Sequence, residues 1–379
     1  MKNSAAMTLF PFIIRIFALK IVVMNAIFTK SIVDWYAENQ RKLPWRETKS
    51  PYAIWISEII LQQTRVAQGY DYYLRFMQRF PTVQDLASAS EDEVLLMWQG
   101  LGYYSRARNL HKAARQIVEM GGFPSDYTSI LALPGIGEYT AAAISSFAYG
   151  LPHAVLDGNV FRVLSRYFGI DTPIDSTQGK KLFRALADEM LDRNDSATYN
   201  QAIMDFGALV CTPHASCSSC PLSETCAAFR TNTVDELPVK SHVTKVRPRH
   251  LIYLYICVDG KILLHRRGEG DIWQGLYEPV LLELKADEQE SFAERLCSLF
   301  PDAVLLDKSR KHQLSHQLLI ADFYVLNATS PAEVSEKIAQ LFPADSLSKD
   351  YFWTPETSLD EYASPRLLLE FYKKRSLCR

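Results

Sequence analysis

The segment LPGIGEYTA, residues 133–141, places two glycines, Gly135 and Gly137, directly before an alanine-rich run that is typical of a helix. Glycine permits a tight turn, and it lets backbone N–H groups approach a phosphate at the positive end of the following helix. On its own the pattern also fits an ordinary connection between two helices. It therefore predicts a helix–turn–helix unit, with phosphate contact as one of two interpretations.

A single aspartate follows this turn in the string LDGNV, residues 156–160. Asp157 is well placed as the N-cap of a helix predicted from about Asn159 to Phe168, where backbone donors would hold its carboxylate ionised. Position alone favours a capping role.

A carboxyl group in apolar surroundings precedes the turn. Ser50 followed by Pro51 predicts the start of a helix that runs towards Arg65, with Glu58 in its interior. The neighbours of Glu58 are almost all apolar, and desolvation by such residues raises the pKa of a carboxyl group. We therefore expect Glu58 to be protonated and available as an acid.

Four cysteines form a C-x5-C-x2-C-x5-C motif: Cys211, Cys217, Cys220 and Cys226. Four soft ligands within one short loop suit a [4Fe–4S] cluster. A zinc ion and free structural thiols are the alternatives, although zinc ribbons usually pair two C-x2-C units or include histidine. Whichever metal binds, the pattern favours a role in folding the loop over redox catalysis.

The spacing of apolar residues divides the chain into a helical part and an α+β part. Helical periodicity extends from about residue 27 to 229. A polar and basic stretch then reads as a linker. Beyond it, Asp259-Gly260 predicts a hairpin between strands at 251–258 and 261–266; a strand at 323–326 and a helix at 292–300 follow. The expected domains are an N-terminal extension (1–25), a helical domain (26–230), the linker (231–249) and an α+β domain (250–379).

The composition restricts location and partners less than the motifs do. The formal net charge of −2 excludes a globally basic DNA-binding protein but permits a local site. Seven unevenly placed cysteines favour a reducing cytoplasm over a secreted disulfide scaffold. The apolar run from Leu9 to Val23 could be a signal or anchor, but Arg15 and Lys20 interrupt it, so an extension upstream of Met24 and no membrane association are expected.

Taken together, the glycine turn, the single aspartate and the four cysteines resemble the endonuclease III superfamily of DNA glycosylases, which use a helix-hairpin-helix turn. The strings PWR (44–46), LQQT (61–64) and GLGYYSRAR (100–108) resemble the MutY-type adenine glycosylases in particular. This resemblance implies a monomeric enzyme of base excision repair. Its substrate would be double-stranded DNA in which adenine is mispaired with 8-oxoguanine or guanine, and its cofactor a [4Fe–4S] cluster.

The residue at position 139 indicates the reaction subclass. Bifunctional relatives, which also cut the DNA backbone, carry a nucleophilic lysine there, and this chain has Tyr139. A Schiff base needs an amine, so the sequence predicts hydrolysis without efficient strand cleavage. A bifunctional glycosylase/lyase and a non-catalytic iron–sulfur DNA-binding protein are the alternatives. The first cysteine spacer is five residues where the family usually has six, which affects the path of the loop.

The resemblance also implies roles for individual residues. Glu58 would protonate adenine at N7, and Asp157 would face the sugar with Asn159 and Tyr139 positioning it. Gln63 and Tyr103 would insert into the duplex when the base leaves it. The residues matching the adenine pocket are Trp45, Arg46 and Gln201. Arg106 and Arg108 are predicted equally well to contact phosphate or to lie on a solvated helix face.

The C-terminal part resembles the lesion-recognition domain of this family, which is similar to Nudix hydrolases. WQGLY (273–277) marks the fold, and LSH (314–316) resembles a loop, usually written FSH, that contacts oxidised guanine. Ser315 and His316 are therefore the candidate contacts. The R-E-x-x-E-E string that binds magnesium in working hydrolases is absent from the sequence. We thus expect a binding module, with nucleotide hydrolysis as the alternative.

Overall fold

The structure is a computed structural model, and it describes residues 25–241, 245–285, 288–341 and 350–377. The expected N-terminal extension therefore lies almost entirely outside the described residues. Among the helices that are described, none combines the length and the apolar character needed to span a bilayer.

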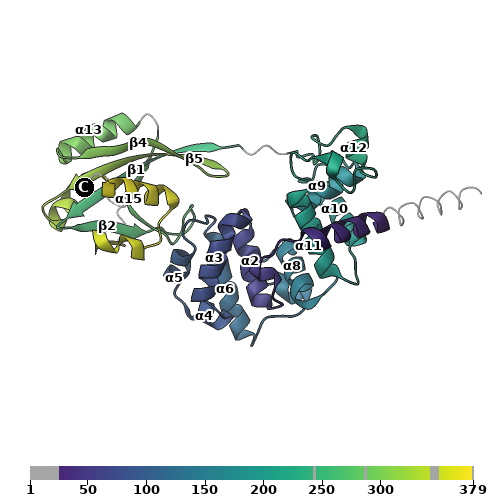
Figure 1. The fold of residues 1–379 in the computed structure, drawn as a ribbon. Helices are drawn as coiled ribbons and strands as arrows, with labels where there is room; N and C mark the ends of the chain where they lie inside the picture. The colour runs from purple at the N-terminus through teal and green to yellow at the C-terminus, as the bar shows by residue number, and fades with distance from the viewer. Residues whose placement is uncertain (1–24, 242–244, 286–287, 342–349, 378–379) are drawn as a thin grey trace, which may run out of the picture. The chain divides into compact units, whose positions relative to one another are not determined.

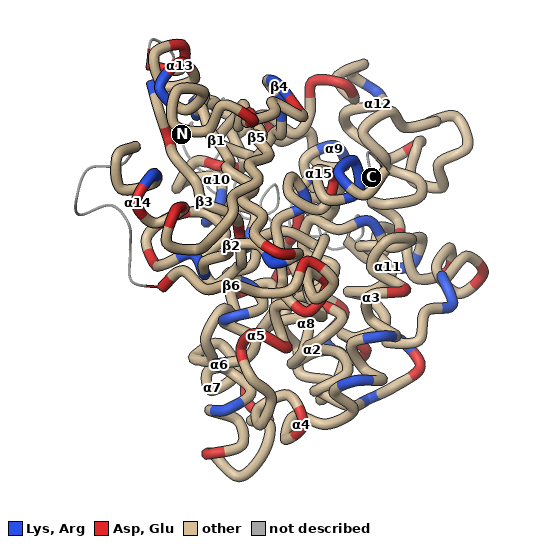
Figure 2. The backbone as a smooth tube through the Cα atoms, turned by 90° about the vertical axis from the view of Figure 1, so that its left-hand side faces the viewer, with Lys and Arg blue, Asp and Glu red and all other residues tan. Residues whose placement is uncertain are grey.

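The chain forms two compact units. Unit 1 comprises Met1–Tyr73 and Gln116–Val243, and unit 2 comprises Leu74–Arg115 and Thr244–Arg379. The segment Leu74–Arg115, expected in the helical domain, groups with the C-terminal part, and unit 1 extends past residue 230 into the stretch expected to be a linker. Figure 2 shows basic and acidic residues interspersed along the chain, in keeping with the small net charge.

Unit 1 is helical throughout its described residues, as predicted (Figure 1). A first helix covers residues 25–39. The others are η1 (Pro44–Arg46), α2 (Pro51–Leu61), α7 (Tyr127–Leu131), α8 (Glu138–Tyr149), α9 (Gly158–Phe168), α10 (Thr177–Met190), α11 (Ser196–Leu209), η2 (Cys217–Ser219) and α12 (Ala227–Thr231). Two more helices, α3 (Val66–Arg79) and α6 (Ser105–Glu119), belong partly to each unit.

Helix α2 begins as the sequence predicts and ends early. The Ser50 side chain accepts a hydrogen bond from the Ala53 amide at 3.3 Å, and Pro51 occupies the first helical position. The helix ends at Leu61 and does not reach Arg65, because Gln62 has an extended ψ of 115° and Gln63 has a φ of 56°. The prediction of the longer helix was wrong for this reason.

The packing of α2, α8, α9 and α11 brings the candidate site together. Helix α2 packs against α8, and α11 packs against both α8 and α9. Gly207 of α11 allows the closest of these approaches, since a Cβ atom there would lie 2.7 Å from the Cβ of Asn159 on α9. Real Cβ atoms do not approach other atoms this closely, so the α9–α11 contact depends on the missing side chain.

Unit 2 contains several helices and a six-stranded mixed sheet that is covered on both faces. Its elements are α4 (Val83–Ser88), α5 (Glu91–Met97), β1 (Arg247–Val258), β2 (Lys261–Arg266), β3 (Tyr277–Leu284), α13 (Gln289–Leu299), β4 (Val304–Gln313), β5 (Gln317–Asn327), α14 (Pro331–Leu341), β6 (Tyr351–Pro355), η4 (Glu356–Glu361) and α15 (Arg366–Leu377). The strand order is β4-β5-β1-β3-β2-β6. Strand β1 pairs in parallel with β5 and antiparallel with β3.

Alternation along β1 explains how both faces are buried. Its residues at positions 252, 254, 256 and 258 pack with α13 and α14, whereas those at 251, 253, 255 and 257 pack with α15. The predicted hairpin is confirmed: Val258 pairs with Lys261, and both turn residues, Asp259 and Gly260, have positive φ. The predicted strand at 323–326 and helix at 292–300 correspond to β5 and α13.

The stretch expected to be a linker, 231–249, is ordered at both ends. Leu237 is buried, its carbonyl accepts from the Arg166 guanidinium at 3.0 Å, and the Ser241 amide donates to Asp175 at 2.9 Å. From Arg247 the chain already pairs with β5. Hydrogen bonds thus hold the described residues at both ends of this stretch.

Candidate active site

A cavity of about 360 Å³ lies in unit 1, where η1, α2, α8, α9 and α11 meet. The predicted residues that line it are Trp45, Arg46, Glu58, Tyr139, Asp157, Asn159 and Gln201. Gln63 and the turn glycines Gly135 and Gly137 are not part of its lining. The cavity therefore collects the residues predicted for acid chemistry and for base recognition, from segments far apart in the sequence.

Glu58 is a buried carboxyl group of this cavity. Its side chain lies in the buried stretch of α2, and the residue is 8 % exposed. Burial raises the pKa of its carboxyl group to about 7, and the negative charge of Asp157 acts in the same direction. A hydrogen bond from Tyr139 and the charge of Arg46 oppose this rise. The prediction that apolar surroundings raise this pKa is confirmed.

Tyr139 joins the glycine turn to Glu58. It is the second residue of α8, and its hydroxyl donates to Oε2 of Glu58 at 2.8 Å and lies 3.3 Å from the sulfur of Met204. Burial, followed by the negative charges of Glu58 and Asp157, raises the pKa of the phenol well above its usual value. Tyr139 is therefore a neutral donor that orients the Glu58 carboxyl group.

Asp157 is the N-cap of α9, as predicted. Its Oδ1 accepts from the amides of Asn159 and Val160 at 2.9 and 2.8 Å, and its Oδ2 accepts from the Asn159 side chain at 2.9 Å. Burial nevertheless raises the pKa of Asp157 above its ordinary value, because desolvation outweighs these donors and the charge of Arg162. We expected the cap hydrogen bonds to keep Asp157 ionised. They do lower the pKa of its carboxyl group, but desolvation by burial raises it more.

Asn159 is itself held by a basic side chain. Arg162 donates to Oδ1 of Asn159 at 2.9 Å and to the carbonyl of Gly207 at 2.6 Å. The Asn159 amide group is therefore oriented with its nitrogen towards Asp157. This connection links the carboxylate to helix α11.

Helix α11 carries an ion network that the sequence did not predict. Asp205 on α11 accepts two hydrogen bonds from Arg46, at 2.5 and 2.8 Å, and is also bonded by Arg41. Gln201, one turn earlier, accepts from the Tyr36 hydroxyl at 2.7 Å. Trp45 is buried and packs edge-on against Tyr73, with ring centroids 5.1 Å apart.

The glycine turn has the geometry its sequence predicts. Gly135 has a φ of 75°, a conformation that side chains other than glycine rarely adopt, and Gly137 is the N-cap of α8. A Cβ atom at Gly137 would meet nothing within 4 Å. The backbone at the start of α8 is thus approachable, which is what phosphate contact requires.

The four cysteines lie in one half-buried loop after α11. Cys217 begins η2, Cys220 follows it, and Cys226 caps α12. Burial raises the pKa of Cys220 to about 11, and the charges of the other three cysteines add to the rise. The four thiols therefore interact electrostatically within this loop. Within the part of the chain that is described, no group of three or more His, Cys, Asp or Glu side chains forms a ready metal site.

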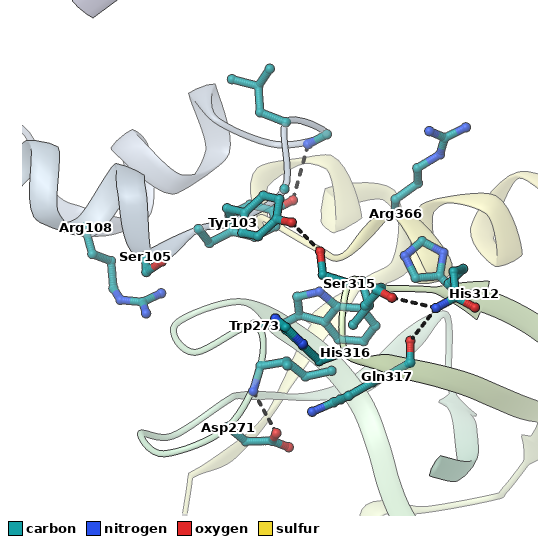
Figure 3. Close-up of a pocket in the computed structure, with 17 residues that line it drawn as sticks. Tyr103, Ser105, Arg108, Asp271, Trp273, His312, Ser315, His316, Gln317 and Arg366 are labelled. Atoms are coloured by element: carbon teal, nitrogen blue, oxygen red, sulfur yellow. Dashed lines mark hydrogen bonds between the residues drawn. The ribbon is translucent and has the colours of Figure 1, made fainter. Parts of the chain in front are cut away.

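A second cavity, of about 490 Å³, lies in unit 2 and is lined by three of the predicted recognition residues, Tyr103, Ser315 and His316 (Figure 3). Tyr103, with a φ of 48°, is hydrogen-bonded through its hydroxyl to the hydroxyl of Ser315. His316 also lines the cavity, as do Trp273, which the sequence assigned only to the fold, and His312, which it did not single out.

The two arginines next to Tyr103 bond within the protein. Arg106 donates to the carbonyls of Leu101 and Gly102, and Arg108 donates to the carbonyl of Gln274 at 2.7 Å. Neither side chain lies on a freely solvated helix face. Arg106 also lies over the ring of Tyr103, 5.5 Å from its centroid, and so supports that side chain.

Comparison with known proteins gives two family matches. Residues 56–189 match the HhH-GPD superfamily of base excision DNA repair proteins, and residues 252–374 match the NUDIX domain. The adenine DNA glycosylase of Buchnera aphidicola subsp. Baizongia pistaciae is 38% identical over 256 residues, which cover 66% of this chain and 72% of the relative. The human adenine DNA glycosylase is 45% identical over 213 residues, covering 53% and 39%.

A solved structure of a thermostable thymine-DNA glycosylase is similar to the helical part. It has a TM-score of 0.52 and is 30% identical, with 55% of this chain and 97% of the other covered. The sequence resemblance to helix-hairpin-helix glycosylases and to a Nudix-like second domain is thus confirmed.

Proposed function

Because the chain belongs to the adenine DNA glycosylases of base excision repair, we propose that it removes adenine mispaired with 8-oxoguanine or guanine and hydrolyses only the N-glycosidic bond. The observation that carries the proposal is the pairing of Glu58 and Asp157 in one cavity. Burial raises the pKa of Glu58 to about 7, whereas Asp157 is held by three hydrogen-bond donors.

Adenine leaves poorly as an anion, so the base must gain a proton as the glycosidic bond breaks. In the proposed reaction the protonated Glu58 transfers its proton to N7 of adenine. The electron pair of the glycosidic bond moves to the base, and the sugar becomes oxocarbenium-like. The Asp157 carboxylate stabilises this cation, and water completes the hydrolysis.

Recognition of the mispair is assigned to both cavities. Trp45, Arg46 and Gln201 would surround the flipped adenine, and Gln63 and Tyr103 would fill the space it leaves in the duplex. The backbone at Gly135 and Gly137 would contact a DNA phosphate. Ser315 and His316 would contact the oxidised guanine.

The experiment that tests the proposal compares duplexes containing A opposite 8-oxoguanine, A opposite guanine, A opposite T, or thymine glycol. We expect release of adenine from the first two, with strand breaks only after alkali. Because Tyr139 has no amine, borohydride should trap no covalent complex. Scission without alkali together with trapping would instead establish a bifunctional enzyme.

We further propose that Cys211, Cys217, Cys220 and Cys226 hold a [4Fe–4S] cluster whose role is to fold the loop after α11. Arg166 supports this loop, because it donates to the carbonyls of Thr212 and Pro213 at 2.6 and 2.9 Å. When bound, the cluster would supply four metal–thiolate bonds that fix the loop. The mutual repulsion of the thiolates would then be relieved.

The cluster makes a spectroscopic prediction. Purified protein should absorb near 400 nm, where cysteine-ligated iron–sulfur clusters absorb and zinc sites do not. Cys220→Ser should abolish this absorption and lower the melting temperature. Cys297→Ser is the matched control, because Cys297 is an exposed residue of unit 2. Stoichiometric zinc without visible absorption would refute the cluster.

The second cavity, which contains Ser315, leads to a prediction about selectivity. Ser315→Ala should lower the preference for A opposite 8-oxoguanine over A opposite guanine by up to about tenfold, the equivalent of one hydrogen bond. Single-turnover rates on the two duplexes measure this ratio. Ser309→Ala, in β4 and outside the cavity lining, is the control. Magnesium-dependent hydrolysis of oxidised dGTP by the full chain would favour the alternative, a working Nudix hydrolase.

A further inference from the structure

Asp205 is the most completely buried carboxylate near the active-site cavity, with a side chain that is 0% exposed. It lies on α11 one turn after Gln201, so both side chains project from the same face of the helix. Neither the sequence motifs nor the family match singles it out. Every contact that the structure gives its carboxylate comes from Arg41 or Arg46.

Arg46 and Asp205 form a bidentate ion pair. Nη1 of Arg46 is 2.5 Å from Oδ2 of Asp205, and Nη2 is 2.8 Å from Oδ1, so the two planar groups face each other through parallel hydrogen bonds. This bidentate arrangement restricts the orientation of a guanidinium group as well as its position. Arg46 is 12% exposed and lines the active-site cavity, whereas Asp205 does not line it.

The charge of Asp205 is secured by the same contacts. Burial alone would raise the pKa of its carboxyl group, but the hydrogen bonds and charges of Arg46 and Arg41 outweigh burial and lower it. Asp205 is therefore ionised throughout the pH range in which Glu58 titrates.

We propose that Asp205 is a positioning residue for adenine excision: its carboxylate holds the Arg46 guanidinium at the cavity wall, at a fixed separation from Glu58. The proposal rests on the function proposed above, in which Glu58 is the acid and Arg46 borders the base. Asp205 itself touches neither the substrate nor the reacting atoms.

The position of Arg46 matters because burial raises the pKa of Glu58 and three neighbouring groups then adjust it. Tyr139 from α8 donates to its carboxylate, Asp157 at the start of α9 adds a negative charge, and Arg46 from η1 adds a positive one. If Arg46 lost its two bonds to Asp205, Glu58 would be an available carboxylate inside the same cavity. A guanidinium that turned towards it would lower the pKa of Glu58 and remove the acid at neutral pH.

The test uses the full chain with its cofactor and compares Asp205→Asn, Asp205→Glu and Ser196→Ala with the unchanged protein. Ser196 is the matched control, because it is buried on the same helix and its hydroxyl donates to the carbonyl of Leu151 at 2.9 Å, away from the cavity. Three quantities are measured: the single-turnover rate of adenine release from pH 5.5 to 9, the dissociation constant for the duplex, and the melting temperature.

For Asp205→Asn we expect the rate at neutral pH to fall about 10- to 100-fold. The alkaline limb of the pH profile should move down by roughly one pH unit. Asp205→Glu keeps the charge and the paired oxygens, so it should restore the position of the limb and much of the rate. Ser196→Ala should lower the melting temperature and leave the limb in place.

A purely structural role predicts a different result. If Asp205→Asn lowered only the melting temperature, or if the limb stayed or moved to higher pH, the positioning role would be refuted. If the unchanged protein released no adenine from either mispair, the proposed function itself would fail. The two failures are therefore distinguishable.

Discussion

Replacement of Asp157 by asparagine is expected to reduce the single-turnover rate of adenine release by about 10³-fold, the upper end of the effect of removing one electrostatic contact to a developing charge. Asparagine is as good an N-cap as aspartate, so α9 should keep its first-turn hydrogen bonds. The substitution removes the negative charge that is proposed to stabilise the sugar cation. Rapid-quench assays on the A:8-oxoguanine duplex measure the rate directly.

The matched control for this change is Asp195→Asn. Asp195 is the N-cap of α11 and accepts from the Thr198 amide at 3.1 Å, but it is exposed and does not line the active-site cavity. The Asp195→Asn variant should release adenine at the same rate as the unchanged protein. Adenine release retained in Asp157→Asn would instead favour a non-catalytic DNA-binding protein, in which Glu58 and Asp157 have no chemical role.

Glu58→Gln is expected to lower the rate by at least about 10²-fold, since an amide cannot donate a carboxyl proton to adenine. It should also stabilise the protein at neutral pH. The pKa of Glu58 is about 7 in the folded protein and 4.5 ordinarily, so the unfolded chain releases this proton first as the pH rises. The contribution of Glu58 to the free energy of unfolding is therefore fully present below pH 4.5. It declines by roughly 3 kcal/mol as the pH rises to about 7.

Glutamine removes this penalty while its carbonyl oxygen can still accept from Tyr139. Glu58→Gln should consequently unfold at higher denaturant concentration than the unchanged protein at pH 7.5, and at nearly the same concentration at pH 4.5. A variant that is equally inactive but less stable at pH 7.5 would contradict the raised pKa. In the unchanged protein, the rate of release should fall about tenfold per pH unit above pH 7, because Glu58 must be protonated to act.

Local sequence patterns predicted the parts of the site that depend on neighbours in the chain. Ser50 and Pro51 start α2, Asp157 caps α9, and the apolar residues around Glu58 raise its pKa, all as their immediate context indicates. The end of α2 was missed, because glutamine is not a helix-breaking residue and nothing in the sequence indicates the non-helical dihedral angles of Gln62 and Gln63.

The contacts between distant segments could not be read from the sequence. Asp205 lies 159 residues from Arg46, and in the sequence it looks like an ordinary polar position on an amphipathic helix. Only its burial beside two arginines in the structure identifies it as the carboxylate that holds Arg46. The same holds for Trp273 and His312 in the second cavity, whose spacing gives no sign that they share a pocket with Tyr103.

The close packing at Gly207 has a consequence for how the gene tolerates change. Position 207 carries no side chain, yet any side chain there would collide with Asn159, whose amide group donates to the Asp157 carboxylate. Under the proposed function, a missense change at this codon would impair adenine excision although every residue proposed to react remained intact. A survey of inactivating mutations should therefore recover substitutions at Gly207 as well as at the residues proposed to be catalytic.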